Sequence, residues 1–249
     1  MQKLKFWFRA IDVIDSKHFV RGVPDVATMI TGYEIKQHGV GDCSVLSSLA
    51  VAAHHEFKHQ YKTKLISHNI FPQDTSNTPI YNPEGKYIVK LYLNGSWRAV
   101  EVDDYLPVDS YGQLIGAESN KGKLWVSLME KAYLKAHGGY DFQGSNSSRD
   151  LFILTGWLPE VIDLKTYNRD KLWQRIYNGY KNRDCLITCG TGPIENEDAI
   201  GLVSGHAYAI LEIMEFNGVK MLMLKNPWGH FRYKGKYSVD DKKSWTPEL

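Results

Sequence analysis

Three short blocks, far apart in the chain, each contain a residue type that nucleophilic chemistry at sulfur requires. Cys43 ends the block QHGVGDC, His206 lies in SGHA, and Asn226 begins NPWG. A cysteine with a distant histidine and asparagine is the expected set of a thiol nucleophile, its base and the group that orients the base. Each block alone is more often structural, but the ordered set predicts a thiol protease.

The chemistry depends on ionising the thiol. A free thiol has a pKa of about 8.5, whereas attack on an amide carbonyl requires the thiolate. Apolar residues recur at helical spacing after Cys43, so we expect this residue at the start of an amphipathic helix capped by Asp42. The positive end of that helix favours an anion at the sulfur. His206 would take the thiol proton and later protonate the leaving amine, while Asn226 would fix the plane of the ring.

The reaction also needs hydrogen-bond donors for the oxyanion. Gln37 lies six residues before Cys43. We expect its side-chain amide and the backbone N–H of Cys43 to form an oxyanion hole, in which the loss of one donor typically costs about 3 kcal/mol of transition-state stabilisation.

The last two β-rich runs of the chain are expected to form a hairpin around Asn217-Gly218, with His206 at its start and Asn226 at its end. With a plain two-residue turn, Asn226 would face Ala209 and point away from the histidine. A register shift of one residue makes it face Tyr208, on the side of the sheet that His206 shares. We therefore predict a bulge or register shift at this turn.

A helical stripe from residue 124 to residue 136 is followed by Gly138-Gly139, a pair suited to a helix C-terminus. We place a boundary between two lobes at this pair. The first lobe, residues 1–137, would carry the cysteine and Gln37. The second, residues 138–249, would carry the histidine and the asparagine.

Composition narrows the class of protein. The 249 residues are 43% hydrophobic, which is enough for at least one core and allows two lobes. Thirty basic against 28 acidic residues give a formal charge of +2, too small a surplus for a nucleic-acid-binding protein. Charge interrupts the N-terminus too early for a signal peptide, and no run approaches the roughly 20 apolar residues of a membrane helix.

The three cysteines, Cys43, Cys185 and Cys189, are too few and odd in number for a disulfide-stapled secreted domain. We therefore expect a cytoplasmic protein. Cys185 and Cys189 would lie roughly 13 Å apart along one strand, too far to form a bridge. They are predicted to be small buried hydrophobic residues.

Several blocks together resemble the calpain family of cysteine proteases. The matching patterns are Q-x-x-x-G-D-C at 37–43, V-D-D-x-L-P at 102–107, L-M-E-K-A-Y at 128–133, G-H-A-Y at 205–208 and N-P-W-G at 226–229. Further sequence segments at residues 81–87, 138–147 and 245–249 are similar to those of the PalB branch of atypical calpains, which lacks EF-hands. The resemblance covers nearly the whole chain.

The resemblance implies a two-lobed α+β papain-like fold and an endopeptidase that makes limited cuts in protein substrates through a thioester. It implies no organic cofactor. Trp228 would lie in the cleft and shield the histidine and asparagine. In the PalB branch, ESCRT-III-related proteins bind domains outside the core, so recruitment from the cytoplasm to endosomes would use parts outside this chain.

Two rival functions share the fold. One is a catalytically silent scaffold that binds endosomal sorting proteins. The other is a different acyl-transfer enzyme, such as a transglutaminase or a deubiquitinase. The presence of Cys43, His206 and Asn226 together disfavours a silent scaffold. The G-D-C, G-H-A-Y and N-P-W-G sequences around these residues disfavour both rival functions.

Calcium ligands depart from the family pattern. Conventional calpain cores have an acidic residue where this chain has Lys123, and acidic residues after N-P-W-G where it has Arg232 and Val239. Calcium prefers several oxygen ligands, which a cation or an alkyl group does not supply. We predict that neither core calcium site is retained, since Glu34 alone does not make a site, and that the chain has no metal centre.

Overall fold

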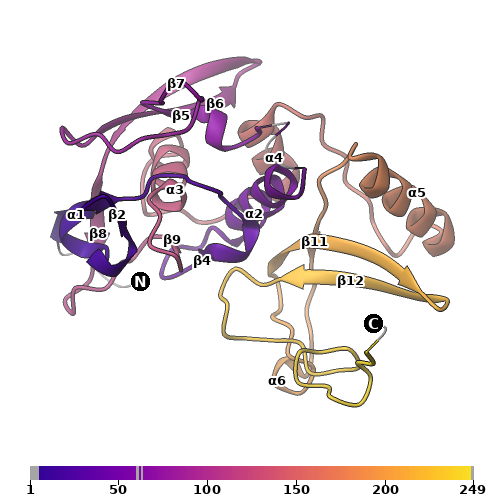
Figure 1. Ribbon diagram of the computed structural model, residues 1–249. Helices are drawn as coiled ribbons and strands as arrows, with labels where there is room; N and C mark the ends of the chain where they lie inside the picture. Colours follow the sequence, from indigo (N-terminus) through magenta and orange to yellow (C-terminus); the bar gives the residue numbers. More distant parts are fainter. Residues whose placement is uncertain (1–5, 60–61, 63, 248–249) are drawn as a thin grey trace.

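Helix α2 (Cys43–Lys58) lies near the middle of the molecule, with sheets and α3 on one side and the β11–β12 hairpin on the other (Figure 1). This computed structural model describes residues 6–59, 62 and 64–247. The mixture of helices and small antiparallel sheets is α+β, as predicted.

The elements around and before α3 are mostly short. They are β1 (Phe6–Arg9), α1 (Ala10–Val13), β2 (Phe19–Val20), β3 (Val23–Pro24), β4 (Ile35–Lys36), β5 (Ile70–Phe71), β6 (Lys86–Leu93), β7 (Ser96–Asp103), β8 (Tyr105–Val108), β9 (Glu118–Ser119) and α3 (Trp125–Ala136). The 3₁₀ turns are Ser16–His18, Gly32–Glu34 and Ser67–Asn69. The strands form the antiparallel sets β1–β8, β2–β3, β4–β9 and β5–β6–β7.

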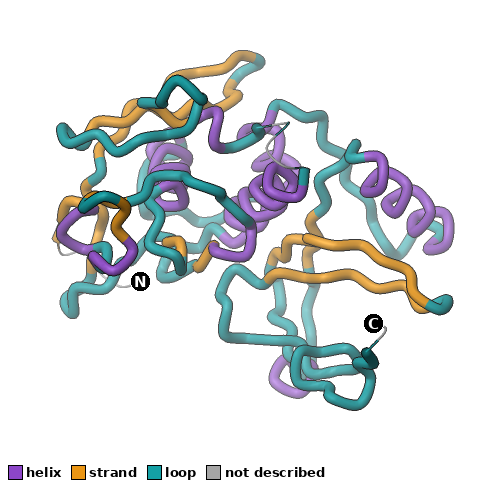
Figure 2. The backbone as a smooth tube through the Cα atoms, in the orientation of Figure 1, coloured by secondary structure: helices purple, strands orange, loops and turns teal. Residues whose placement is uncertain are grey.

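The later elements include one three-stranded sheet. They are α4 (Ser147–Thr155), α5 (Arg169–Asn182), β10 (Thr188–Gly190), α6 (Glu197–Ile200), β11 (Ala207–Phe216) and β12 (Val219–Lys225). The sheet has the antiparallel order β10–β11–β12. After β12 the described chain runs as turns and loop to residue 247 (Figure 2).

The main core joins the two sets of elements. It contains residues of α2, α3 and β6 together with Ala209 and Leu211 of β11. A smaller cluster lies between β11 and α5, formed by Trp173, Ile210 and Ile213. Helix α4 follows Gly138-Gly139 in sequence but packs against α2 and β6. The lobe boundary after residue 137 stays a prediction.

Helix α2 differs from the amphipathic helix that its sequence predicts, because most of its residues are buried, polar ones included. Ser47 Oγ donates to the Ala207 carbonyl (2.9 Å), and Glu56 accepts hydrogen bonds from the backbone N–H groups of Ile66 (3.0 Å) and Ser67 (3.1 Å). Buried polar groups of this kind need such partners. The partners come from distant segments, which is why local periodicity does not reveal them.

The hairpin register matches the prediction near the site, but the shift is not at the turn. Phe216 pairs with Val219 in the plain two-residue register, and the shift occurs between Ile210 and Glu212. Beyond it, Ala209 pairs with Lys225. The next position, Asn226, therefore continues toward Tyr208, on the face that His206 shares.

The three cysteines all lie in the described part of the chain and are free. Cys185 and Cys189 are half-buried, not fully buried as predicted, because they precede or lie in the edge strand β10. Burial raises the pKa of both thiols, that of Cys189 to about 11. Neither thiol is therefore poised as a thiolate at neutral pH.

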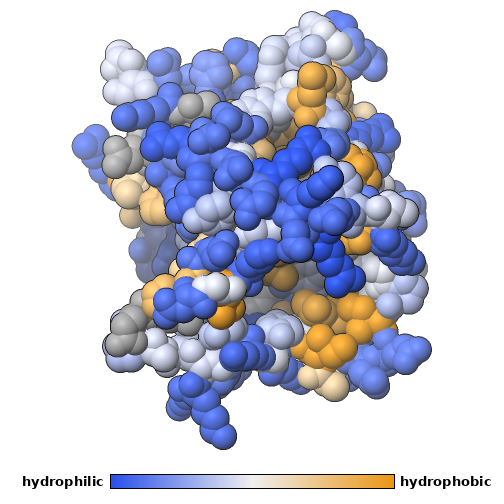
Figure 3. All heavy atoms as spheres, turned by 90° about the vertical axis from the view of Figure 1, so that its right-hand side faces the viewer, coloured by the Kyte–Doolittle hydropathy of each residue, from blue (hydrophilic) through white to orange (hydrophobic). Residues whose placement is uncertain are grey.

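Within the described residues, no helix is both long and apolar enough to span a membrane. The edge strand β12 nevertheless carries exposed apolar residues, Leu222, Met223 and Leu224. The face in Figure 3 is mostly hydrophilic, with apolar side chains gathered in its lower part.

Candidate active site

Cys43 is the first residue of α2 and is half-buried. Asp42 holds the N-cap position, as predicted, but its side chain makes no capping hydrogen bond and is fully buried. The carboxyl therefore does not occupy the N–H groups of the first helical turn. Their partial positive charge therefore remains available to stabilise a thiolate at Cys43.

His206 and Asn226 lie in direct contact. The ring Nε2 of His206 and the side-chain Oδ1 of Asn226 are 2.8 Å apart. The Asn226 amide is held in one orientation, because Oδ1 also accepts from the Trp228 N–H (3.0 Å) and Nδ2 donates to the Phe231 carbonyl (2.9 Å). The ring therefore donates from Nε2 to Asn226, which leaves Nδ1 for a reacting group.

The environment of His206 favours its neutral form. The side chain is 4% exposed, and this burial lowers its pKa while the hydrogen bond to Asn226 acts in the opposite direction. A buried imidazole gains its positive charge more easily when an anion such as a thiolate lies nearby.

Two contacts bring the three blocks together. Ser47, one turn after Cys43, donates to the carbonyl of Ala207, the residue after His206. The backbone N–H of Gln37 donates to the Pro227 carbonyl (3.0 Å), which lies next to Asn226. Between the two described residues Cys43 and His206 themselves, the structure contains no hydrogen bond.

Gln37 is 7% exposed and turns its amide inward. Its Nε2 donates to the Val40 carbonyl (2.8 Å) and to Asp42 Oδ1 (3.3 Å). Both N–H groups of the amide thus point at protein acceptors. The predicted oxyanion role requires the amide to give up one of these bonds on substrate binding.

Two aromatic rings contact His206. The ring of Trp228 lies with its centroid 4.7 Å from that of His206, tilted by 49°, and the ring of Tyr208 approaches edge-on at 5.0 Å. Trp228 was predicted as a shielding residue, and the structure places it beside the histidine. Tyr208 was not singled out as a site residue. Its signal was its position two residues after His206 on the same strand face.

The positions of the family's calcium ligands do not fit a calcium ion here. The Lys123 Nζ donates to Glu34 Oε2 (3.0 Å) and to the Met29 carbonyl (2.9 Å). The Trp125 Nε1–H donates to the other oxygen of Glu34 (2.6 Å). Glu34 is 1% exposed, so this lysine is the counter-charge of a buried carboxylate.

The second set of positions fits no better. Val239 is 74% exposed and offers an alkyl side chain. Burial and the nearby Arg232 charge lower the pKa of Lys225 to about 8, and neither cationic side chain supplies an oxygen ligand. In residues 6–59, 62 and 64–247, no group of three or more His, Cys, Asp or Glu side chains is placed to hold a metal ion.

Known proteins match this chain over most or all of its length. Residues 2–248 match the family model described as calpain family cysteine protease. The chain is 46% identical over 257 residues to Calpain-7 of Mus musculus and of Homo sapiens, in alignments that cover 100% of the chain and 30% of each relative. It is 38% identical over 230 residues to the calpain-like protease palB/RIM13 of Aspergillus oryzae, covering 89% of the chain and 26% of the relative. The chain thus spans less than a third of the length of these relatives.

Proposed function

Because this chain belongs to the calpain family of cysteine proteases, we propose that it hydrolyses peptide bonds in proteins with Cys43 as the nucleophile. The observation that carries the proposal is the His206–Asn226 hydrogen bond of 2.8 Å. It orients a buried base whose segment is tied by Ser47 to the helix that begins at Cys43.

The reaction follows from these groups. Proton transfer from the Cys43 thiol to Nδ1 of His206 gives a thiolate, which attacks the scissile carbonyl carbon. The tetrahedral oxyanion collapses to a thioester as His206 gives its proton to the leaving amine. Water then attacks the thioester while His206 takes its proton, and the carboxylic product leaves as the thiol re-forms. Gln37 and the backbone N–H of Cys43 would stabilise both oxyanions.

Asn226 would serve without adding charge. A neutral acceptor fixes the tautomer and the plane of the His206 ring, and it leaves the imidazolium stabilised chiefly by the thiolate. Trp228 and Tyr208 would keep water from the ring, which strengthens electrostatic interactions at the site.

Calcium independence of this core is part of the proposal. The Lys123 ammonium already neutralises Glu34 and binds the Met29 carbonyl. A metal ion at this position would have to displace a buried ion pair. Alignment of the catalytic residues would therefore not require calcium binding.

From the resemblance to the PalB branch, we also propose limited cuts in protein substrates at endosomes. ESCRT-III-related proteins would be bound by domains outside this chain, which would recruit the core from the cytoplasm. The relatives' additional length leaves room for such domains.

A silent scaffold is the alternative function. Two observations favour it. In the part of the chain that the structure describes, Cys43 and His206 share no hydrogen bond, and the Gln37 side-chain amide is directed inward. In a scaffold this arrangement would be permanent, whereas in a protease it would change when substrate binds.

Labelling with a cysteine-directed epoxide separates the two functions. We expect one equivalent of label at Cys43, at equal rates with calcium and with a chelator, and none in Cys43→Ala. The matched controls Cys185→Ala and Cys189→Ala should label like the wild type. No labelling of Cys43 under any condition would favour the scaffold.

A further inference from the structure

Four polar atoms without a hydrogen-bond partner among the described residues lie behind the first turn of α2. They are Gln37 Oε1, Asp42 Oδ2, Glu130 Oε2 and the Tyr140 hydroxyl. Buried polar groups are almost always paired, so a cluster of orphaned atoms calls for an explanation. Two of the four belong to carboxyl groups.

The two carboxyl groups are close enough for each to influence the pKa of the other. Asp42 is 0% exposed and Glu130, on α3, is 1% exposed. Their remaining oxygens have other donors: Asp42 Oδ1 accepts from Gln37 Nε2 (3.3 Å), and Glu130 Oε1 accepts from the Ala117 N–H (2.7 Å). That leaves Asp42 Oδ2 and Glu130 Oε2, both buried, as the two carboxyl oxygens without a partner.

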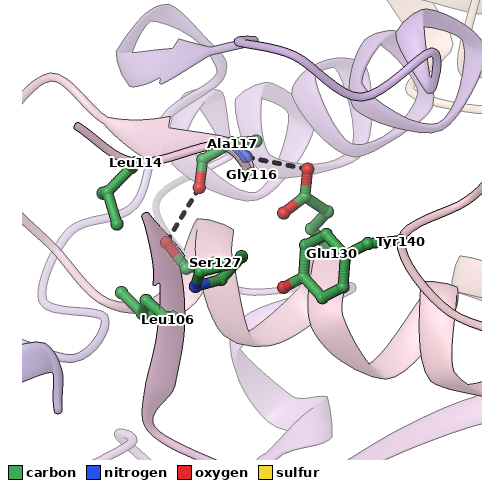
Figure 4. Close-up of a pocket in the computed structure, with 8 residues that line it drawn as sticks. Leu106, Leu114, Gly116, Ala117, Ser127, Glu130 and Tyr140 are labelled. Carbon is green, nitrogen blue, oxygen red and sulfur yellow. Dashed lines mark hydrogen bonds between the residues drawn. The ribbon is translucent and has the colours of Figure 1, made fainter. Parts of the chain in front are cut away.

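Figure 4 shows how Glu130 reaches this position. Its carboxyl turns away from α3 toward the Gly116-Ala117 backbone, beside the ring of Tyr140. A Cβ atom on Gly116 would lie 2.4 Å from Glu130 Oε2, so only glycine allows this approach. The backbone is therefore shaped around the carboxyl group.

Two ionised carboxylates cannot form a hydrogen bond, because both only accept. Buried side by side they would also repel each other. One proton between Oδ2 and Oε2 removes both problems and gives both of these carboxyl oxygens a partner.

We propose that Asp42 and Glu130 share one buried proton, and that this acid pair positions Gln37 and the first residue of α2. Asp42 precedes Cys43 directly and accepts from the Gln37 amide, so a displaced Asp42 would disturb both residues. Glu130 acts only through Asp42 and is a positioning residue.

The raised pKa values of the two carboxyl groups agree with a shared proton. Burial raises the pKa of Glu130 to about 7, and burial followed by the Glu130 charge raises that of Asp42 well above its usual value. The other titratable groups that face the pair are Cys43, Tyr140, and His38, whose ring lies 3.0 Å from Glu118.

The sign of the pH effect follows. The folded state keeps a proton that the unfolded chain releases above the ordinary carboxyl pKa. The stabilising contribution is therefore complete below about pH 4.5 and is lost as the pH rises through the raised values.

Amide substitutions test the proton directly. In Glu130→Gln, the amide oxygen can still accept from Ala117 while the NH₂ group donates to Asp42 Oδ2. In Asp42→Asn, the oxygen still serves Gln37 and the NH₂ group donates to Glu130. In the double variant two NH₂ groups face each other, so the hydrogen bond is lost.

Three measurements follow. The infrared carbonyl band of a protonated carboxylic acid should be present at neutral pH in the wild type and absent in Glu130→Gln. The melting temperature of Glu130→Gln should rise relative to the wild type between pH 5 and pH 8. The double variant should be less stable than either single variant, because the two substitutions are strongly coupled.

The catalytic consequence rests on the proposed function. Glu130→Leu should slow epoxide labelling of Cys43 by about tenfold, and Glu130→Gln should restore most of that rate. Absence of the acid band, or a double variant as stable as the singles, would overturn the shared proton. If these hold but no protein labels, the protease function fails and the acid pair stands.

Discussion

At the scale of single residues, His206 is subject to two opposing influences. Burial lowers its pKa, and the hydrogen bond to Asn226 raises it by favouring the charged ring. The imidazolium form is therefore lost as the pH rises through a lowered value. This loss would appear as the alkaline limb of the labelling rate if His206 is the partner of the thiolate.

Substitution of Asn226 should move this limb in a predictable direction. Asn226→Ala removes the acceptor, so the alkaline limb should shift to lower pH and the maximal labelling rate should fall. Asn226→Asp places a negative charge beside the ring and should shift the limb to higher pH. Rates of epoxide labelling from pH 5 to pH 10 test both. If the alkaline limb lies at the same pH in both variants, a group other than His206 controls it.

The sequence identifies functional residues that stand in local motifs, but it does not reveal contacts between distant segments. Cys43, His206 and Asn226 stand in ordered blocks, so their types and order were enough to single them out. Asp42 was predicted as a cap from local rules, yet its side chain turns inward because Glu130 of α3 lies behind it. No local pattern contains that contact.

At the scale of elements, the register of β11 and β12 is decided by a bulge rather than by the turn. Asn217 and Gly218 take the positive φ angles, 48° and 76°, of a plain two-residue turn. The shift lies at Leu211, which packs into the core with α2 while the next residue, Glu212, also contacts α2. The sequence predicted that a shift was needed, but its place depends on packing against α2.

Glu212 connects three elements. It accepts hydrogen bonds from His54 (3.2 Å) and Lys58 of α2 and from Tyr180 of α5. Burial raises the pKa of Glu212, but these bonds outweigh it and hold the pKa below its usual value. The carboxylate is thus a link between the helix that begins at Cys43 and the strand that follows His206.

Removing this link should weaken the fold. Glu212→Ala leaves three donors without their acceptor, and we expect the free energy of unfolding to fall by about 1–2 kcal/mol, discounted for partial solvent exposure. Urea denaturation at neutral pH measures it. The exposed Glu195→Ala is the matched control and should change little. A similar loss in both variants would argue against a specific link.

At the scale of the whole molecule, alignment of the candidate site is a property of the shared core. Residues of α2, α3, β6 and β11 pack together, and Ser47 and Gln37 tie the three blocks to one another. The sequence indicated the α+β class and the separate blocks. It did not indicate that α2 would be enclosed on nearly all sides, because that requires knowing which distant segments cover it.

Lys123 offers a test of whether this alignment is independent of metal. Lys123→Glu would replace the counter-charge of Glu34 with a second carboxylate, beside the Met29 carbonyl. Two carboxylates and a carbonyl oxygen in one place require a cation to balance their charge, and calcium prefers oxygen ligands of this kind. We expect the variant to label Cys43 more slowly than wild type in chelator and to recover part of the rate in millimolar calcium. Wild type should be indifferent to calcium.

The exposed Lys121→Glu makes the same change in net charge two residues away and should behave as wild type. Melting temperatures with and without calcium give a second readout that does not depend on protease activity, because a cation bound to the folded state raises them. If Lys123→Glu gains neither calcium-dependent stability nor calcium-dependent labelling, the lysine does not stand in for a cation. If wild type is itself stimulated by calcium, alignment of the site depends on a metal position that these contacts do not reveal.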